Sequence, residues 1–244
     1  MGTRLAHAAA AAGALALAAV CLRTYRAETA YGAGLALAER ADASPGEDVP
    51  GRLEAYEEAS RIDPGEGLYR LRTGQIRLQR AKRAPGVPDD AELAAAAAAL
   101  DAAARTRPLD VRVHCGRVQL ARARRDLDGA LRAVSAARAA APISPAALLA
   151  ASATQTWAWR VTGDASHLRD ALAAARDLDA IGEATAAREL AADLRNSGHE
   201  LAGDLAEAAA GDIGLLRFAA RIVAPARPEV ARVLAPPVPQ PGGD

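Results

Sequence analysis

The fold is decided by three stretches of equal length, RLEAYEEASRIDP (residues 52–64), AAAALDAAARTRP (96–108) and ALRAVSAARAAAP (130–142). Each stretch ends on a proline, and Pro142 lies 34 residues after Pro108. The second and third stretches begin with a small residue. A bulky residue follows four positions after it, an alanine three positions after the bulky residue, and a proline five positions after that alanine. The first stretch has the same spacing from the bulky residue onward. This spacing predicts the second helix of a repeated helix pair, because small side chains let neighbouring helices approach closely. A two-helix unit cannot bury both of its apolar faces alone, so we expect the pairs to stack.

The positions that carry the spacing are expected to pack helix against helix. They are Tyr56, Ala59 and Pro64 in the first stretch, Ala96, Leu100, Ala103 and Pro108 in the second, and Ala130, Val134, Ala137 and Pro142 in the third. In the first stretch Arg52 stands where the other two have the leading alanine. Gly74 lies inside the next predicted helix, where glycine costs about 1 kcal/mol relative to alanine. We therefore expect a neighbouring helix to approach the backbone closely at Gly74.

The composition favours an all-α protein. Hydrophobic residues make up 51% of the chain but aromatic residues only 3%, and alanine supplies most of the difference. Strands would need more β-branched and aromatic residues. Basic and acidic residues balance at 30 each, so no overall positive field attracts nucleic acid.

Helical spacing and turn residues divide the chain into an ordered series of elements. Helices are expected at residues 24–41, 52–63, 67–83, 90–105, 109–124, 127–141, 145–161, from 166 onward, 183–195, 199–210 and 213–223. Asp89 or Asp90, Ser144 and Ser166 are the expected N-caps. Breaks are expected at residues 44–46, 83–88 and 196–198. We expect one repeat domain, residues 24–224, followed by a proline-rich tail, residues 225–244, that begins with a short helical turn.

Residues 5–22 carry no formal charge and are rich in alanine and leucine. As a helix they would reach about 27 Å at ~1.5 Å per residue, close to the thickness of a hydrocarbon core. Arg4 precedes the run, and Arg23 and Arg26 follow it. We expect residues 1–23 to form a single-pass transmembrane anchor in a bacterial inner membrane, with the repeat domain in the periplasm. A cleaved signal peptide and a buried alanine-rich helix of the array are the alternatives.

The spacing on the second helix of each pair resembles that of the tetratricopeptide repeat family. Gly74 falls where that family has a glycine on the first helix, and the junction at residues 63–69 is similar to the family's inter-repeat junction. Arg117 and Val118 depart from the family pattern in the third unit. The resemblance covers residues 50–145 and implies a right-handed solenoid of antiparallel helix pairs. It also implies a scaffold that binds a peptide or another protein, not an enzyme.

The sequence offers no chemistry for catalysis. The four histidines stand in separate elements with no second ligand three or four residues away, so we expect no metal site. Phosphate-binding, dinucleotide-binding and nucleophile motifs are absent from the sequence. We therefore expect no catalytic residue, no cofactor and no small-molecule substrate.

The strongest charge feature is the run of basic residues in the predicted helix 67–83. The residues expected to contact a partner there are Arg70, Thr73, Gln75, Arg77, Gln79 and Arg80. They could form a groove for an acidic peptide or a C-terminal carboxylate, and a solvated helix face is the alternative. We expect a membrane-anchored scaffold for a protein or peptide partner in a cell-envelope complex. The alternative function is an accessory subunit of a membrane enzyme that assembles cell-surface polysaccharide.

Overall fold

The computed structural model describes residues 2–43, 51–83, 88–195 and 201–234. Within these ranges the chain forms twelve helices and no strand, which confirms the predicted all-α class. The chain divides into two compact units, residues 1–108 and residues 109–244. Each unit is a repeat-like assembly of helices and is described by itself.

The first unit contains four helices, α1 (Gly2–Ala43), α2 (Arg52–Ile62), α3 (Gly67–Arg83) and α4 (Asp90–Thr106). Consecutive helices contact one another, most extensively α1 with α2 and α3 with α4. These are the pairs that the sequence spacing predicts. Pro64 and Gly65 end α2, and the chain re-enters a helix at Gly67 as expected.

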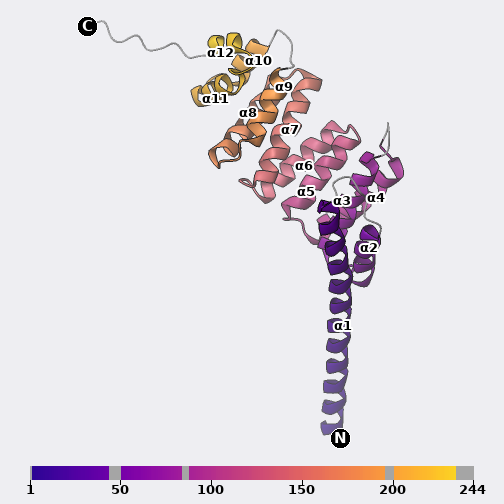
Figure 1. The fold of residues 1–244 in the computed structure, drawn as a ribbon. Helices are drawn as coiled ribbons and strands as arrows, with labels where there is room; N and C mark the ends of the chain where they lie inside the picture. The colour runs from indigo at the N-terminus through magenta and orange to yellow at the C-terminus, as the bar shows by residue number, and fades with distance from the viewer. Residues whose placement is uncertain (1, 44–50, 84–87, 196–200, 235–244) are drawn as a thin grey trace, which may run out of the picture. The chain divides into compact units, whose positions relative to one another are not determined.

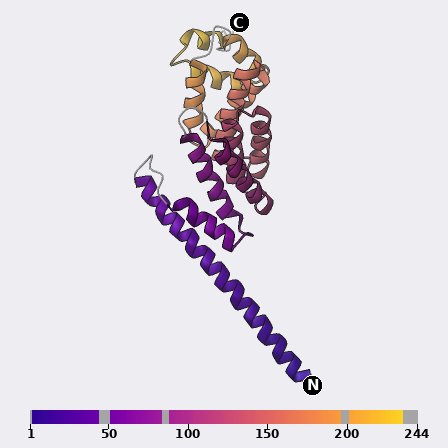
Figure 2. The ribbon, with the colours of Figure 1, turned by 90° about the vertical axis from the view of Figure 1, so that its right-hand side faces the viewer.

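Helix α1 is one continuous helix that joins the residues expected to form the anchor (1–23) to those expected to form the first helix of the repeat domain (24–41). Its 42 residues span about 60 Å at ~1.5 Å per residue. From Ala27 onward the helix packs on its neighbours, with Ala27 and Tyr31 buried. Every side chain from residue 12 to residue 26 is exposed. Figures 1 and 2 show that this part of α1 extends well beyond α2.

The second unit contains eight helices within its described residues. They are α5 (Val111–Ala123), α6 (Leu127–Ala140), α7 (Pro145–Thr162), α8 (Ala165–Ala180), α9 (Thr185–Arg195), α10 (Leu201–Ala208), α11 (Ile213–Val223) and α12 (Pro228–Leu234). Helix α5 pairs with α6 and α7 with α8, while α7 also contacts α5 and α9. At the C-terminal end the regular pairing is lost, because α8 packs against α9, α10 and α11.

Aspartates provide the N-caps that the structure shows. Asp89 accepts hydrogen bonds from the backbone N–H groups of Ala91 and Glu92, at 2.9 and 3.2 Å, as predicted. The prediction for Ser166 is wrong: Asp164 caps α8 by accepting from the backbone N–H of Ser166 at 2.8 Å. Ser144 stands at the N-cap position of α7 but makes no capping hydrogen bond with its side chain.

Part of the predicted tail belongs to the folded second unit. Val230 and Leu234 of α12 are buried in the hydrophobic core of that unit. The predicted breaks at residues 44–46 and 196–198, most of the break at 83–88, and the tail beyond residue 234 lie outside the described residues.

Candidate functional site

The residues of the repeat spacing lie at helix crossings, except for the prolines. Six of them have no exposed surface: Ala59, Ala96, Leu100, Ala103, Ala130 and Ala137. Tyr56 and Val134, the bulky residues of the first and third stretches, are 2% and 4% exposed. Pro64, Pro108 and Pro142 were also expected to pack helix against helix, but they are exposed, and each follows the end of its helix.

Gly74 lies at a close approach between α3 and α4. A Cβ atom on Gly74 would stand 2.8 Å from Cγ of Leu100 and 3.3 Å from the carbonyl oxygen of Ala96. The same relation occurs one pair earlier, where a Cβ on Gly34 of α1 would stand 2.6 Å from the ring of Tyr56. The bulky residue on the second helix of each of these pairs is therefore accommodated by a glycine on the first.

Three tyrosines join α1 to the rest of the first unit. The ring of Tyr31 packs against the rings of Tyr56 and Tyr69, with centroid distances of 5.4 and 5.1 Å. The Tyr69 hydroxyl donates to Glu28 of α1 at 2.7 Å. Burial, and then this hydrogen bond, raise the pKa of Tyr69. These contacts make the second half of α1 the first helix of the array.

Arg77, one of the expected contact residues, lies between two carboxylates of the same unit. It pairs with Glu57 of α2 and, at 3.0 Å, with Glu92 of α4. The Arg77 side chain is only 24% exposed. Its charge is thus used to join three successive helices.

The other expected contact residues divide between the two sides of α3. The Thr73 hydroxyl is buried and donates to the backbone carbonyl of Tyr69 at 3.1 Å. Arg70 and Arg80 are half-buried. Gln75 and Gln79 lie one turn apart, and their side-chain oxygens accept hydrogen bonds from two arginines that the expected contact set did not include.

These two arginines are Arg72 of α3 and Arg52 of α2. Arg72 donates to Gln75 and Arg52 donates to Gln79, both at 3.2 Å. Arg52 is only 9% exposed, although it is charged. The sequence signal for it was its place in the repeat, where the other two stretches have alanine.

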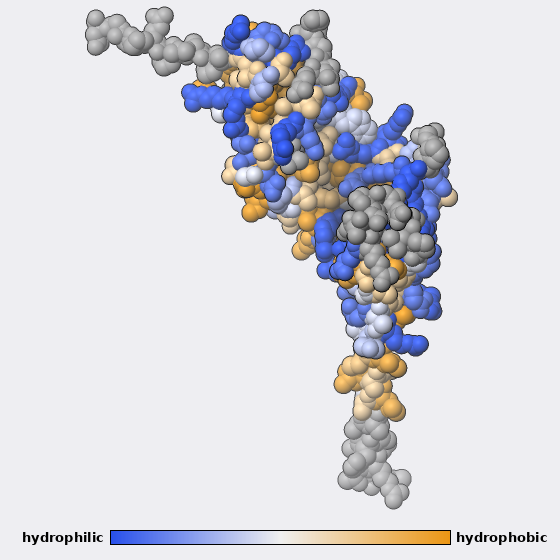
Figure 3. Space-filling view, viewed as in Figure 1, coloured by the Kyte–Doolittle hydropathy of each residue, from blue (hydrophilic) through white to orange (hydrophobic). Residues whose placement is uncertain are grey.

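The exposed half of α1 is strongly apolar. Leu15, Leu17, Val20 and Leu22 are between 58% and 73% exposed. Figure 3 shows these side chains as an apolar band on α1, next to the polar surface of the helix pair. Arg23 marks the boundary, because it donates to the carbonyl oxygen of Ile62 at 2.7 Å and fixes α1 to the end of α2.

No helix among the described side chains is long and apolar enough to cross a membrane. Residues 5–11 of the expected transmembrane span lie outside the described side chains. Residues 12–22, whose side chains the structure describes, are the second part of the expected span.

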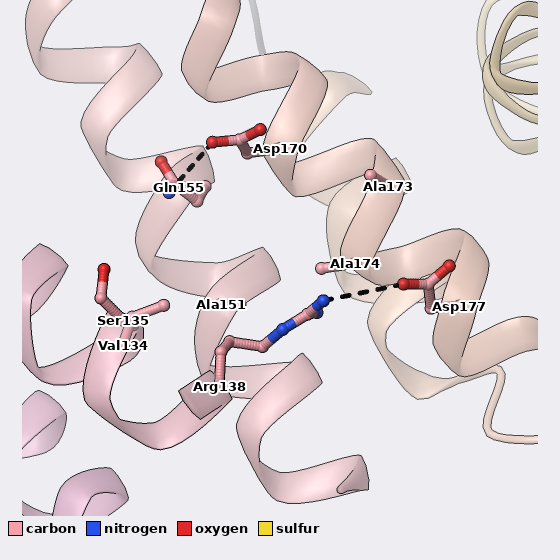
Figure 4. Close-up of a pocket in the computed structure, with 9 residues that line it drawn as sticks. All are labelled: Val134, Ser135, Arg138, Ala151, Gln155, Asp170, Ala173, Ala174 and Asp177. Atoms are coloured by element: carbon pink, nitrogen blue, oxygen red, sulfur yellow. Dashed lines mark hydrogen bonds and ion pairs between the residues drawn. The ribbon is translucent and has the colours of Figure 1, made fainter. Parts of the chain in front are cut away.

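The second unit holds a pocket of about 280 Å³ between α6, α7 and α8. Its lining consists of Val134, Ser135, Arg138, Ala151, Gln155, Asp170, Ala173, Ala174 and Asp177. Figure 4 shows Arg138 directed toward Asp177, at 4.0 Å, and Gln155 toward Asp170, at 3.4 Å. One charge pair, Arg138 with Asp177, thus lies in the pocket, while Asp170 accepts a hydrogen bond from the neutral amide of Gln155.

The two tryptophans of α7 have different environments. Trp159 is 5% exposed and belongs to the core of the second unit. Trp157 is half-exposed and lines an open pocket with Arg122, Arg125, Leu127 and Val161. Residues two apart in a helix point to different faces, so one face cannot bury both rings.

In the described part of the chain, no three His, Cys, Asp or Glu side chains gather as a metal site would require. Comparison of the sequence with protein-family models and with curated proteins finds no match. We therefore infer the function from the surfaces of the two units.

Proposed function

We propose that this protein is a membrane-tethered scaffold of the tetratricopeptide type that binds a protein or peptide partner in a bacterial cell-envelope complex. One observation carries the proposal: a single helix, α1, is apolar and exposed from residue 12 to Leu22 and is the first packing helix of the array from Ala27 onward. Helix pairs that nest at alanine and glycine, with prolines at the ends of the second helices, support a right-handed solenoid.

The lipid bilayer is the occupant that fits the exposed part of α1. The helix continues toward the N-terminus through the uncharged run of residues 5–22, which has arginine at both ends. Large apolar side chains exposed on all sides of a helix are unfavourable in water and favourable in lipid. The ion pair of Arg23 with Asp63, at 3.2 Å, would hold the array at the membrane surface.

Cell fractionation tests the tether. The double variant Leu17→Lys/Val20→Lys places two charges in the proposed span, where each costs about 2.5 to 3.5 kcal/mol. We expect the wild type to stay in the carbonate-washed membrane pellet and this variant to move to the supernatant. The matched control is Leu109→Lys/Ile143→Lys, which changes two residues that are 78% and 82% exposed outside α1. That control should stay in the pellet.

Protease accessibility in intact and in opened cells fixes the side of the membrane. We expect the array to be digested once the outer membrane alone is permeabilised. A wild-type chain found in the supernatant, or a Leu17→Lys/Val20→Lys chain that remains with the membrane as the control does, would reject the tether.

A further inference from the structure

Arg52 occupies a repeat position at which the other two stretches bury a small side chain. At the equivalent positions of α4 and α6, Ala96 and Ala130 have no exposed surface. Arg52 is nearly as buried, with 9% exposure, although it carries a guanidinium. Burial of a charge is costly unless an anion or a full set of hydrogen bonds compensates it.

That compensation is missing within the described residues. Arg52 donates from Nη2 to the amide oxygen of Gln79, and its buried Nε has no hydrogen-bond partner. Helix α3, on which Gln79 lies, has six basic residues and no acidic one. Gln79 is neutral, so the contact orients the guanidinium without cancelling its charge.

The acidic residues of α2 do not compensate Arg52 either. Glu57 pairs with Arg77, and Glu58 pairs with Arg61. Glu54 is exposed in the first turn of the helix. Among the described residues, therefore, no carboxylate is bound to the positive charge at this end of α2.

Arg72 of α3 is held in the same way, by the amide of Gln75, which lies one turn from Gln79. Its Nη1 donates to the amide oxygen of Gln75, and its Nε is also buried without a partner. Burial raises the pKa of the Tyr56 phenol, and the charges of Arg72 and Arg52 both act against this, so both guanidiniums lie within electrostatic reach of that ring. Two arginines, each held by a neutral amide of the same α3 face, therefore stand around one tyrosine.

The start of α2 adds to the positive potential. Gly51 occupies the N-cap position with a φ of 86° and offers no side chain to the free backbone N–H groups of the first turn. A cation at the N-terminus of a helix also opposes the helix dipole, whereas an anion there is favoured.

We propose that Arg52 and Arg72 together bind a carboxylate of an acidic peptide segment on the partner protein, while Gln79 and Gln75 orient the two guanidiniums. This inference rests on the proposed scaffold function. A guanidinium presents parallel N–H donors that match the two oxygens of a carboxylate. The basic face of α3 would draw an acidic segment toward the site.

Fluorescence anisotropy on the full-length protein in a neutral detergent tests the site. The probe is a rhodamine-labelled peptide of alternating glycine and glutamate with an amidated C-terminus, and the comparison peptide has glutamine in place of glutamate. We expect the glutamate peptide to bind at least about tenfold more tightly. Arg52→Met and Arg72→Met should each weaken its binding by about tenfold or more. Arg61→Met is the matched control, because it removes one positive charge from an exposed position on α2, and it should change the affinity less than about twofold.

Two further arms separate the sources of the anion. The glutamine peptide with a free C-terminus measures binding of a terminal carboxylate. Binding of this peptide that is weakened by Arg52→Met would support the same site. Inorganic phosphate serves as the competitor. Displacement of the glutamate peptide by equimolar phosphate would overturn the assignment to a carboxylate.

Thermal unfolding distinguishes a ligand site from a structural arginine. Because Arg52 is a buried charge without a counter-ion, Arg52→Met should raise the unfolding midpoint while it weakens peptide binding. A lower midpoint with the preference for glutamate unchanged would overturn the inference, as would equal affinity for the two amidated peptides. The two proposals can fail separately. If the chain pellets with membranes but shows no preference for the glutamate peptide, the carboxylate site alone is rejected. If the chain is released from the membrane but keeps that preference, only the tether is rejected.

Discussion

The close approach at Gly74 gives the packing of the helix pairs its sharpest test. The perturbation is Gly74→Ala, which adds one methyl group to α3. That methyl would stand 2.8 Å from Cγ and 3.1 Å from Cδ2 of Leu100, well inside van der Waals contact. Alanine gains about 1 kcal/mol of helix propensity over glycine. Forcing an extra carbon into a packed interface costs about 1 to 3 kcal/mol, so we expect a net loss of about 1 kcal/mol.

The sign of this effect depends on Leu100. Leu100→Ala alone truncates a fully buried side chain and should cost about 2 to 5 kcal/mol. In that background the clash is removed, so Gly74→Ala should become stabilising by about 1 kcal/mol, limited by the Ala96 carbonyl oxygen at 3.3 Å. The two substitutions should therefore couple by about 2 kcal/mol.

Hydrogen exchange followed by mass spectrometry measures this effect locally, in peptides from α3 and α4. A loss of about 1 kcal/mol corresponds to roughly fivefold faster exchange. Gly32→Ala is the matched control, because no atom lies within 4 Å of its added Cβ. It should leave α3 and α4 unchanged and slow exchange in α1. Slower exchange in α3 after Gly74→Ala alone, or a double variant no more stable than Leu100→Ala, would refute the nesting of α3 on α4.

Three further results are expected. Arg77→Met removes the ion pairs that join α3 to α2 and α4, so it should lower the free energy of unfolding by about 1 kcal/mol, and the loss measured by urea titration should shrink at high salt. The backbone N–H of Leu215 holds the pKa of Asp212 below its ordinary value of 3.8. The ionised Asp212 cap therefore stabilises α11 above pH 3.8 and loses this effect as the pH falls through the pKa of Asp212 in the folded protein. Asp212→Asn should flatten the pH dependence of the melting temperature in this acid range. Burial raises the pKa of Cys115, so a water-soluble thiol reagent at neutral pH should label this thiol slowly in the folded protein and faster in urea, as peptide mass spectrometry would show.

Helix boundaries were predictable wherever turn residues lie next to them in the sequence. Residues 67–83 were predicted as a helix and form α3 with the same two ends, because Pro64 and Gly65 precede the helix and Pro85 follows it. The N-cap of α8 was misplaced by two residues, since Asp164 and Ser166 are both good capping residues and local sequence does not choose between them.

Contacts between distant residues were not predictable from spacing. Gly34 matters because of Tyr56, which lies on another helix, and nothing near Gly34 indicates that partner. Arg77 was expected to contact a partner, but the fold directs it to Glu57 and Glu92 on neighbouring helices. Only the three-dimensional arrangement shows that Arg52, a simple departure from the repeat in sequence, is a buried charge.

Nitroxide accessibility along α1 tests most directly whether one helix serves both as anchor and as the first helix of the array. Spin labels at Leu15, Leu17, Val20 and Leu22 in a Cys21→Ser/Cys115→Ser chain, reconstituted in liposomes, are compared with a label at exposed Leu109. We predict that the α1 labels collide with oxygen dissolved in lipid and are shielded from a water-soluble nickel complex, while Leu109 shows the reverse. Equal access of the nickel complex to the α1 labels and to Leu109 would contradict the proposed tether.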